Sequence, residues 1–290
     1  MRLARSFRSN FLYPKIYDLI NKKLNHRLWP TRLQSRAYKW SKEYETLSQA
    51  TLVNVGAGPY FNHPNWISLD MIPHFTGVNK NKNKIFCNLM DCLTSFPIKD
   101  IDAVYISHCL EHFKLDDAVR LLKAIKQSMK KDAYLRIVVP SFSLILEKIR
   151  GNDRNYFAPL FGKNNSSDFM LQDILYAICS PSPQSRAVNG LLYGTIDTKK
   201  LYQYSDKELL SFSDKEILDI CNNHNLQNNE NGQFHLSTYT AKSLITMLSD
   251  IGFSRVYESQ FMQSSFGPMR ETPLFDGTHP WMSLYVEARL

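Results

Sequence analysis

The sequence predicts an α/β domain built on a mostly parallel β-sheet, and two features of its pattern carry this prediction. From residue 51, strand-like segments alternate with helix-like segments, the order that gives parallel βαβ units. The run Ile137-Val138-Val139 is continuously apolar, as in strands that are buried on both faces of a sheet. In open sheets of this kind, ligands bind beyond the carboxyl ends of the strands. The residues that follow each strand are therefore the first candidates for a functional site.

Five strand-like segments precede residue 141, each short and rich in apolar or β-branched residues. They are residues 51–55, 66–70, 84–89, 101–107 and 134–140. A helix is predicted over about 115–130, because apolar residues recur there at helical spacing. These residues are Ala118, Leu121, Leu122, Ile125 and Met129. Residues 130–133 form the predicted turn into the fifth strand.

Residues 141–233 interrupt this alternation. Helical patches are predicted near 142–150 and 169–178, and a polar, Asn-rich stretch follows at 222–232. The α/β pattern then resumes with an amphipathic helix over 240–250, which Gly252 is suited to end, and with strands over 253–259 and 283–289. Because insertions commonly carry specificity, we expect 141–233 to form a mainly helical lid that sets substrate choice.

On this pattern the chain divides into four parts. They are a basic amphipathic segment (1–46), the ligand-binding core (47–140), the helical insertion (141–233) and the C-terminal part of the core (234–290). The formal net charge of +8 belongs to the first part, because residues 1–40 hold ten basic side chains and one acid. The body of the chain is near neutral, so nucleic acid is not expected as a partner.

A basic amphipathic helix is predicted over residues 11–29. It could lie on an anionic membrane surface, pack as a cap on the following domain, or belong to an organellar transit peptide. The sequence has no apolar run of about 18 or more residues, so no membrane-spanning helix is expected. Its five cysteines include no C-x-x-C pair, which argues against a disulfide framework or a structural zinc site. Reduced thiols favour a cytoplasmic location, with peripheral membrane contact through residues 1–40 as one option.

Glycines and polar residues gather at the ends of the predicted strands. Gly56 and Gly58 follow the first strand, where glycine lets the backbone bend sharply and approach a ligand closely. Asp70 ends the second strand, fourteen residues past Gly56, where an acid typically accepts hydrogen bonds from ribose hydroxyls. Asn88 and His108 follow the third and fourth strands. Together they predict a nucleotide-type cofactor at this edge, although Asp70 could instead cap a turn.

Seven stretches of the chain resemble the class I methyltransferases that use S-adenosylmethionine (SAM), in particular a bacterial branch found with cell-surface polysaccharide biosynthesis. The matching stretches are residues 53–59, 65–70, 87–89, 101–113, 135–140, 235–253 and 283–288. The resemblance implies a Rossmann-like sheet of seven strands, the last of them antiparallel. It also implies that SAM is the cofactor and that the chain is a transferase.

The resemblance assigns a set of residues to SAM. They are Asn54, Gly56, Ala57, Gly58, Asp70, Met71, Asn88, Leu89 and His108. In this set the glycines would line the methionine and ribose, Asp70 would hold the ribose hydroxyls, and Leu89 would pack on the adenine. Asn88 stands where the family usually has Asp, and Tyr60 where a third glycine often lies. An Asn side chain can still hydrogen-bond the adenine edge.

The expected reaction is O-methylation of a sugar or other small or glycan acceptor in surface polysaccharide biosynthesis. A hydroxyl is a poor nucleophile and benefits from a general base, for which the candidates are His108, Glu111, His112 and His235. No metal is expected. The sequence leaves the acceptor, the methylated atom and the oligomeric state open.

Three alternative functions use the same residues. The first is a SAM-fold protein that has lost activity and serves as a binding module, which the Asn88 departure favours. The second is a zinc hydrolase, because His108, Glu111 and His112 spell the inverted motif H-x-x-E-H. The third is nicotinamide binding, which is weakened because Phe61 occupies the place of the last glycine in G-x-G-x-x-G.

Overall fold

The computed structural model describes residues 49–58, 61, 63, 65–70, 83–157, 204–224, 235–271 and 274–290. The basic segment 1–46 and the helical patch predicted near 169–178 lie outside these residues. The chain forms two compact units. The sheet unit comprises the described residues of Asp18–Leu110, Asp116–Val139 and Ala241–Leu290. The insertion unit comprises Glu111–Leu115 and the described residues of Pro140–Thr240.

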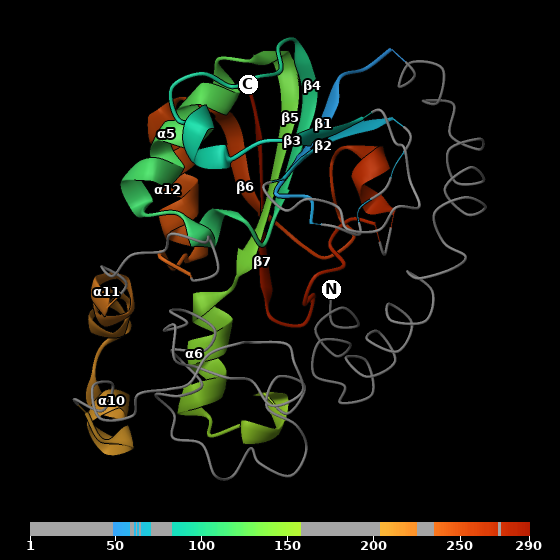
Figure 1. Cartoon of the computed structure of the whole chain (residues 1–290). Helices are drawn as coiled ribbons and strands as arrows, with labels where there is room; N and C mark the ends of the chain where they lie inside the picture. The colour runs from blue at the N-terminus through green and yellow to red at the C-terminus, as the bar shows by residue number, and fades with distance from the viewer. Residues whose placement is uncertain are drawn as a thin grey trace. The chain divides into compact units, whose positions relative to one another are not determined.

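The sheet unit is built on seven strands (Figure 1). They are β1 (Leu52–Val55), β2 (Trp66–Asp70), β3 (Lys84–Phe86), β4 (Ile101–Ser107), β5 (Met129–Pro140), β6 (Ser254–Ser259) and β7 (Ser283–Arg289). Their order across the sheet is β3-β2-β1-β4-β5-β7-β6. Strand β1 pairs in parallel with β2 and β4, as does β2 with β3 and β4 with β5, whereas β6 and β7 are antiparallel. The predicted seven-stranded α/β sheet is therefore confirmed.

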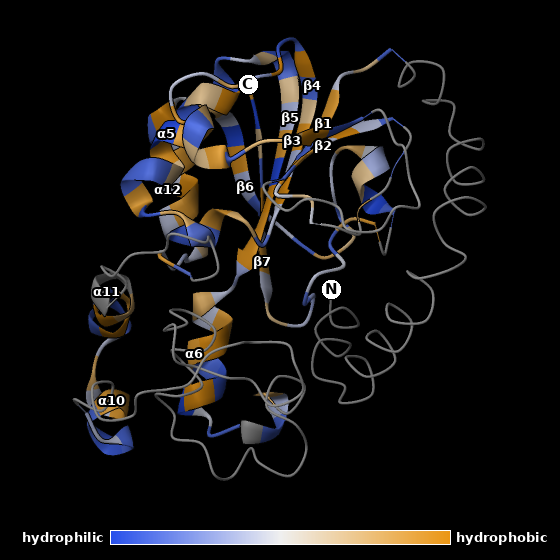
Figure 2. Ribbon diagram, viewed as in Figure 1, coloured by the Kyte–Doolittle hydropathy of each residue, from blue (hydrophilic) through white to orange (hydrophobic). Residues whose placement is uncertain are grey.

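The apolar runs of the sequence become the buried strands of this sheet. All four residues of β1 are buried, and so are Ile137, Val138 and Val139 of β5. Two helices, α5 (Leu115–Lys126) and α12 (Ala241–Ile251), lie side by side and carry apolar and polar residues on different faces (Figure 2). Helix α12 packs on β6 and β7 and ends at Gly252, whose φ of 92° confirms the predicted C-cap.

The largest differences from the sequence-based prediction lie at two boundaries. Helix α5 ends at Lys126, and β5 already begins at Met129, which pairs with Ile101. Residues 130–133, predicted as a turn, instead form an irregularity within β5, where Asp132 has a φ of 62°. Long-range contacts cause this difference, because Asp132 N–H donates to the Leu290 carbonyl and Lys130 bonds Asp102. At the other boundary, the third strand ends at Phe86 rather than Leu89.

The described part of the insertion unit is mainly helical. It contains α6 (Phe142–Arg150), η3 (Arg154–Phe157), α10 (Asp206–Ser211) and α11 (Asp214–His224), and α6 confirms the patch predicted near 142–150. A capping box at Ser205 and Glu208 starts α10. Arg150 at the end of α6 donates to the Phe212 carbonyl at 2.7 Å and pairs with Asp214 at 2.8 Å. Among the described residues, no helix has the length and apolar character needed to cross a bilayer.

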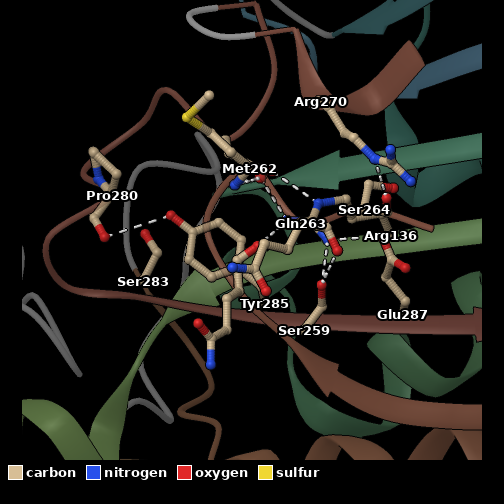
Figure 3. A network of polar contacts seen from close by, with 12 residues as sticks. Arg136, Ser259, Met262, Gln263, Ser264, Arg270, Pro280, Ser283, Tyr285 and Glu287 are labelled. Atoms are coloured by element: carbon tan, nitrogen blue, oxygen red, sulfur yellow. Dashed lines mark hydrogen bonds and ion pairs between the residues drawn. The ribbon is translucent and has the colours of Figure 1, made fainter. Parts of the chain in front are cut away.

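An arginine lies at the centre of the sheet unit without any exposed surface (Figure 3). Arg136 on β5 donates to Asp276 at 2.8 and 2.5 Å, to Glu287 at 2.7 Å, to the Ser259 hydroxyl at 3.0 Å and to the Gln260 carbonyl at 2.8 Å. Burial lowers the pKa of this guanidinium, but Asp276 and Glu287 raise it above its usual value. The network joins β5 to β6, β7 and the segment between them, which sequence periodicity does not reveal.

Candidate active site

A glycine turn joins the end of β1 to the end of β2. Gly56 and Gly58 both have a φ of 67°, a conformation that glycine adopts readily. Gly56 N–H donates to the Leu69 carbonyl at 2.9 Å. A Cβ at Gly56 would lie 2.4 Å from Cys109 Sγ, whereas a Cβ at Gly58 would meet no described atom within 4 Å. Close packing therefore requires glycine at the first position, whereas at the second no atom of the described residues restricts a side chain.

Asp70 holds this turn in place. Its Oδ2 accepts a hydrogen bond from Gly58 N–H at 2.6 Å, and the residue is buried. The sequence left two roles open for Asp70, a ribose-binding acid and a turn cap. The hydrogen bond from Gly58 N–H shows that Asp70 does cap this turn. A carboxylate offers about four lone-pair sites, a chemistry that suits hydrogen bonds from ribose hydroxyls. The structure brings Gly56, Gly58 and Asp70 together, as the sequence predicted.

The end of β3 lies next to Asp70. Cys87 N–H donates to the Asp70 carbonyl at 3.0 Å, which places Asn88 one residue farther along the same edge. Asn88 caps the short helix η1 (Leu89–Cys92), and its Oδ1 accepts from Met90 N–H at 3.0 Å. In this orientation the amide NH2 is the group that would donate to a ligand.

The other residues assigned to the cofactor by resemblance lie on the same strands or outside the described chain. Asn54 is buried on β1, and Leu89 is buried in η1. Ala57 belongs to the glycine turn, and its N–H donates to the Leu69 carbonyl at 3.2 Å. Met71 lies outside the described residues.

His108 follows β4 and is held by residues from the end of the chain. Its Nε2 lies 2.8 Å from the Ser283 hydroxyl, and that hydroxyl donates to the His279 carbonyl at 2.8 Å. The Ser283 hydroxyl therefore contacts both the His108 ring and a backbone carbonyl, which fixes the orientation of the ring. Sequence analysis missed Ser283 and His279, and no local pattern links them to His108.

The remaining three candidates meet in the insertion unit. Ligand atoms of Glu111, His112 and His235 all lie within 4.8 Å of one another. His235 Nε2 is 3.9 Å from Glu111 Oε1, and the two imidazole rings meet edge to face with centroids 4.8 Å apart. His108 is not a member of this group, although the H-x-x-E-H motif requires it. The inverted zinc-protease interpretation therefore lacks its first ligand.

Comparisons with known proteins give structural but no sequence relatives. No family model and no curated protein matches the chain. A SAM-dependent methyltransferase from Archaeoglobus fulgidus aligns with 14% identity over 94% of this chain and 99% of its own, at a TM-score of 0.40. A second SAM-dependent methyltransferase, from Mesorhizobium loti, aligns with 13% identity over 87% of this chain and 100% of its own, at a TM-score of 0.41. The 1,6-didemethyltoxoflavin-N1-methyltransferase of Burkholderia thailandensis aligns with 11% identity over 96% of this chain and 87% of its own, at a TM-score of 0.40.

At these identities the activity of this chain has to be inferred from its own residues. The sheet order and strand directions are properties of the chain itself. A parallel sheet with an antiparallel pair at one side and a glycine turn after the first strand is the architecture that the resemblance implied. The chain thus has a Rossmann-like α/β fold of seven strands.

Proposed function

We propose that the chain is a SAM-dependent methyltransferase. The observation that carries this proposal is the hydrogen bond from Gly58 N–H to Asp70 Oδ2, which fixes a glycine turn and an acid at one edge of a parallel sheet. A glycine turn allows close backbone approach, and a neighbouring carboxylate suits the two hydroxyls of a ribose. Among the described residues, no atom lies within 4 Å of a Cβ built at Gly58, which is compatible with a ligand at this place.

The residues of this edge fit the parts of SAM. The turn at Gly56 and Gly58 would face the methionine and ribose, with Asn54, Ala57 and Met71 as further contacts. Asp70 would accept from the ribose hydroxyls. Asn88 would donate its amide to a ring nitrogen of the adenine, on which Leu89 would pack. When bound, SAM would supply a methyl group already activated on a sulfonium.

The chain itself would position the acceptor and take up its proton. We assign His108 as the first candidate for general base, because it follows β4, the strand next to β1 and its glycine turn, and Ser283 orients its ring. Correct alignment of an acceptor with the methyl group can lower the barrier by roughly 7–11 kcal/mol in favourable systems. Glu111, His112 and His235 are the other candidates.

The acceptor proposed is a hydroxyl of a sugar or glycan, by resemblance to the surface-polysaccharide branch of the family. The basic segment 1–40 supports a cytoplasmic enzyme that contacts the membrane surface, since lipid-linked sugars are presented there. Comparing surface glycans by mass spectrometry, with and without the gene, tests this assignment. A missing O-methyl group supports the proposal, and unchanged glycans argue for another acceptor.

Calorimetry with SAM and its demethylated product tests the cofactor. We expect Asp70→Asn to weaken binding by about 1–3 kcal/mol, because ribose hydroxyls lose a charged acceptor. Asp116→Asn, an exposed aspartate on α5, is the matched control and should bind as the unmodified chain does. No binding at millimolar SAM, or binding of a nicotinamide dinucleotide instead, would overturn the proposal. Binding of SAM without methyl transfer to any acceptor tested would identify a binding module.

A further inference from the structure

We propose that Glu111, His112 and His235 bind a divalent transition-metal ion in the insertion unit. This site uses none of the glycine or aspartate residues that are assigned to SAM. The three ligand atoms come from two places in the sequence, Glu111-His112 and His235. Their convergence is a product of the tertiary structure.

The geometry is close to that of a three-ligand metal site. The ligand atoms lie within 4.8 Å of one another, and His235 Nε2 is 3.9 Å from Glu111 Oε1. Around a tetrahedral ion with bonds of about 2.1 Å, ligand atoms lie about 3.4 Å apart. Side-chain rotations would therefore have to bring these atoms closer by up to about 1.4 Å. The rings of His112 and His235 meet edge to face with centroids 4.8 Å apart, and the ligand atoms of both histidines belong to the cluster.

The backbone holds the two parts of this cluster against each other. The Glu111 carbonyl accepts from Leu236 N–H at 2.6 Å and from Ser237 N–H at 3.1 Å. Farther along, Tyr239 forms a parallel bridge with Ser141 at the start of α6. His235 thus begins a segment that is anchored at both ends, and its position beside Glu111 does not depend on its side chain alone.

Burial adds a reason for a cation at this place. The Glu111 side chain is 1% exposed and that of His235 is 14% exposed. A carboxylate so far from water is costly unless donors, cations or a metal face it. A metal ion would contribute more favourable charge than a neutral imidazole. Partial exposure of His235 gives an ion a route to the cluster from solvent.

The donor set indicates the class of metal. Two imidazole nitrogens and one carboxylate suit zinc, iron, cobalt or nickel, whereas magnesium and calcium prefer oxygen ligands. Three protein ligands leave at least one coordination position for water. The alternative arrangement is an ion pair between Glu111 and protonated histidines, which needs no metal.

Metal titration of the full chain tests the site without any SAM present, so its outcome is separate from that of the proposed function. After removal of metals with a chelator, Zn²⁺ is titrated by calorimetry and Co²⁺ by visible absorption, with Mg²⁺ as the control ion. We expect one Zn²⁺ per chain and a Co²⁺ spectrum that reports nitrogen ligands. Even the loss of a partner behind a ligand weakens metal binding about 10–100-fold, so His112→Ala, His235→Ala and Glu111→Gln should each weaken it at least that much.

Two variants sharpen the result. His279→Ala removes a histidine outside the cluster and should leave Zn²⁺ affinity unchanged, as should His108→Ala. Loss of Zn²⁺ binding in His108→Ala would mean that the H-x-x-E-H ligands are used instead and would overturn this ligand set. Absence of Zn²⁺ and Co²⁺ binding to the unmodified chain would identify the cluster as an ion pair. Circular dichroism of each variant shows that it is folded, and the Co²⁺ spectrum of the unmodified chain tests the site without any variant.

Discussion

Replacing Arg136 by Met should destabilise the sheet unit strongly, and more at neutral than at acidic pH. The guanidinium makes five hydrogen bonds, and its side chain is 0% exposed, as is that of Asp276. Methionine fills much of the same volume but leaves Asp276 and Glu287 buried without their cation. Breaking a buried ion pair in this way costs about 3–5 kcal/mol. A domain of ordinary stability has about 5–15 kcal/mol in total, so the variant would be marginal.

The pH dependence follows from the two carboxyl groups. Burial raises the pKa of Glu287, but hydrogen bonds from Ser264, Tyr257 and Ser265 and the charge of Arg136 hold it below its usual value. Its stabilising contribution is therefore present above its unfolded pKa near 4.5 and is lost as the pH falls through the lowered pKa. Burial also raises the pKa of Asp276, and the hydrogen bond and charge of Arg136 partly offset this rise. Without Arg136, the pKa values of both Glu287 and Asp276 rise, so the folded variant binds more protons than the folded unmodified chain. The loss of unfolding free energy in the variant therefore grows as the pH rises above about 4.5.

Urea unfolding of the unmodified and variant chains at about pH 5 and pH 8 measures both effects. Arg120→Met is the matched control, because Arg120 pairs with Asp117 at 3.2 Å on the surface and is 53% exposed. Such surface pairs contribute about 0–1 kcal/mol. The same loss of unfolding free energy at both pH values would refute the argument from buried charge. So would equal losses in Arg136→Met and Arg120→Met.

Three further outcomes are expected. Gly56→Ala should lose about 2–5 kcal/mol of unfolding free energy in urea, because the cost of an unfavourable φ adds to the cost of overlap with Cys109. Gly58→Ala should lose only about 1–2 kcal/mol, the cost of the φ alone. Equal losses in the two variants would contradict this reasoning. Iodoacetamide at about pH 8 should modify Cys87 before Cys92, as measured by peptide mass mapping. The reason is that burial and a hydrogen bond with Cys87 raise the pKa of Cys92 to about 12. Faster labelling of Cys92 would count against this order. Deleting residues 1–40 should reduce sedimentation with anionic vesicles and leave SAM binding intact; unfolding of the truncated chain would identify a structural cap.

The sequence by itself determined the elements whose signals are local. Apolar runs predicted the strands, since side chains that are buried on both faces must be apolar along the whole strand. Gly56, Gly58 and Gly252 were expected to adopt special backbone conformations, and all three have positive φ values. The candidate cofactor edge followed from the same logic, because parallel strands bring their carboxyl ends to one side of a sheet.

Only the tertiary structure decided which distant residues meet. Nothing near His108 in the sequence indicates that Ser283 orients its ring. Nothing near Glu111 indicates that His235 lies beside it. The irregularity at Asp132 in β5 and the burial of Arg136 likewise depend on partners more than a hundred residues away, Leu290 and Asp276. Periodicity and turn propensity are set by neighbouring residues, whereas the ring orientation of His108 and the proposed metal ligands are set by where the chain returns in space.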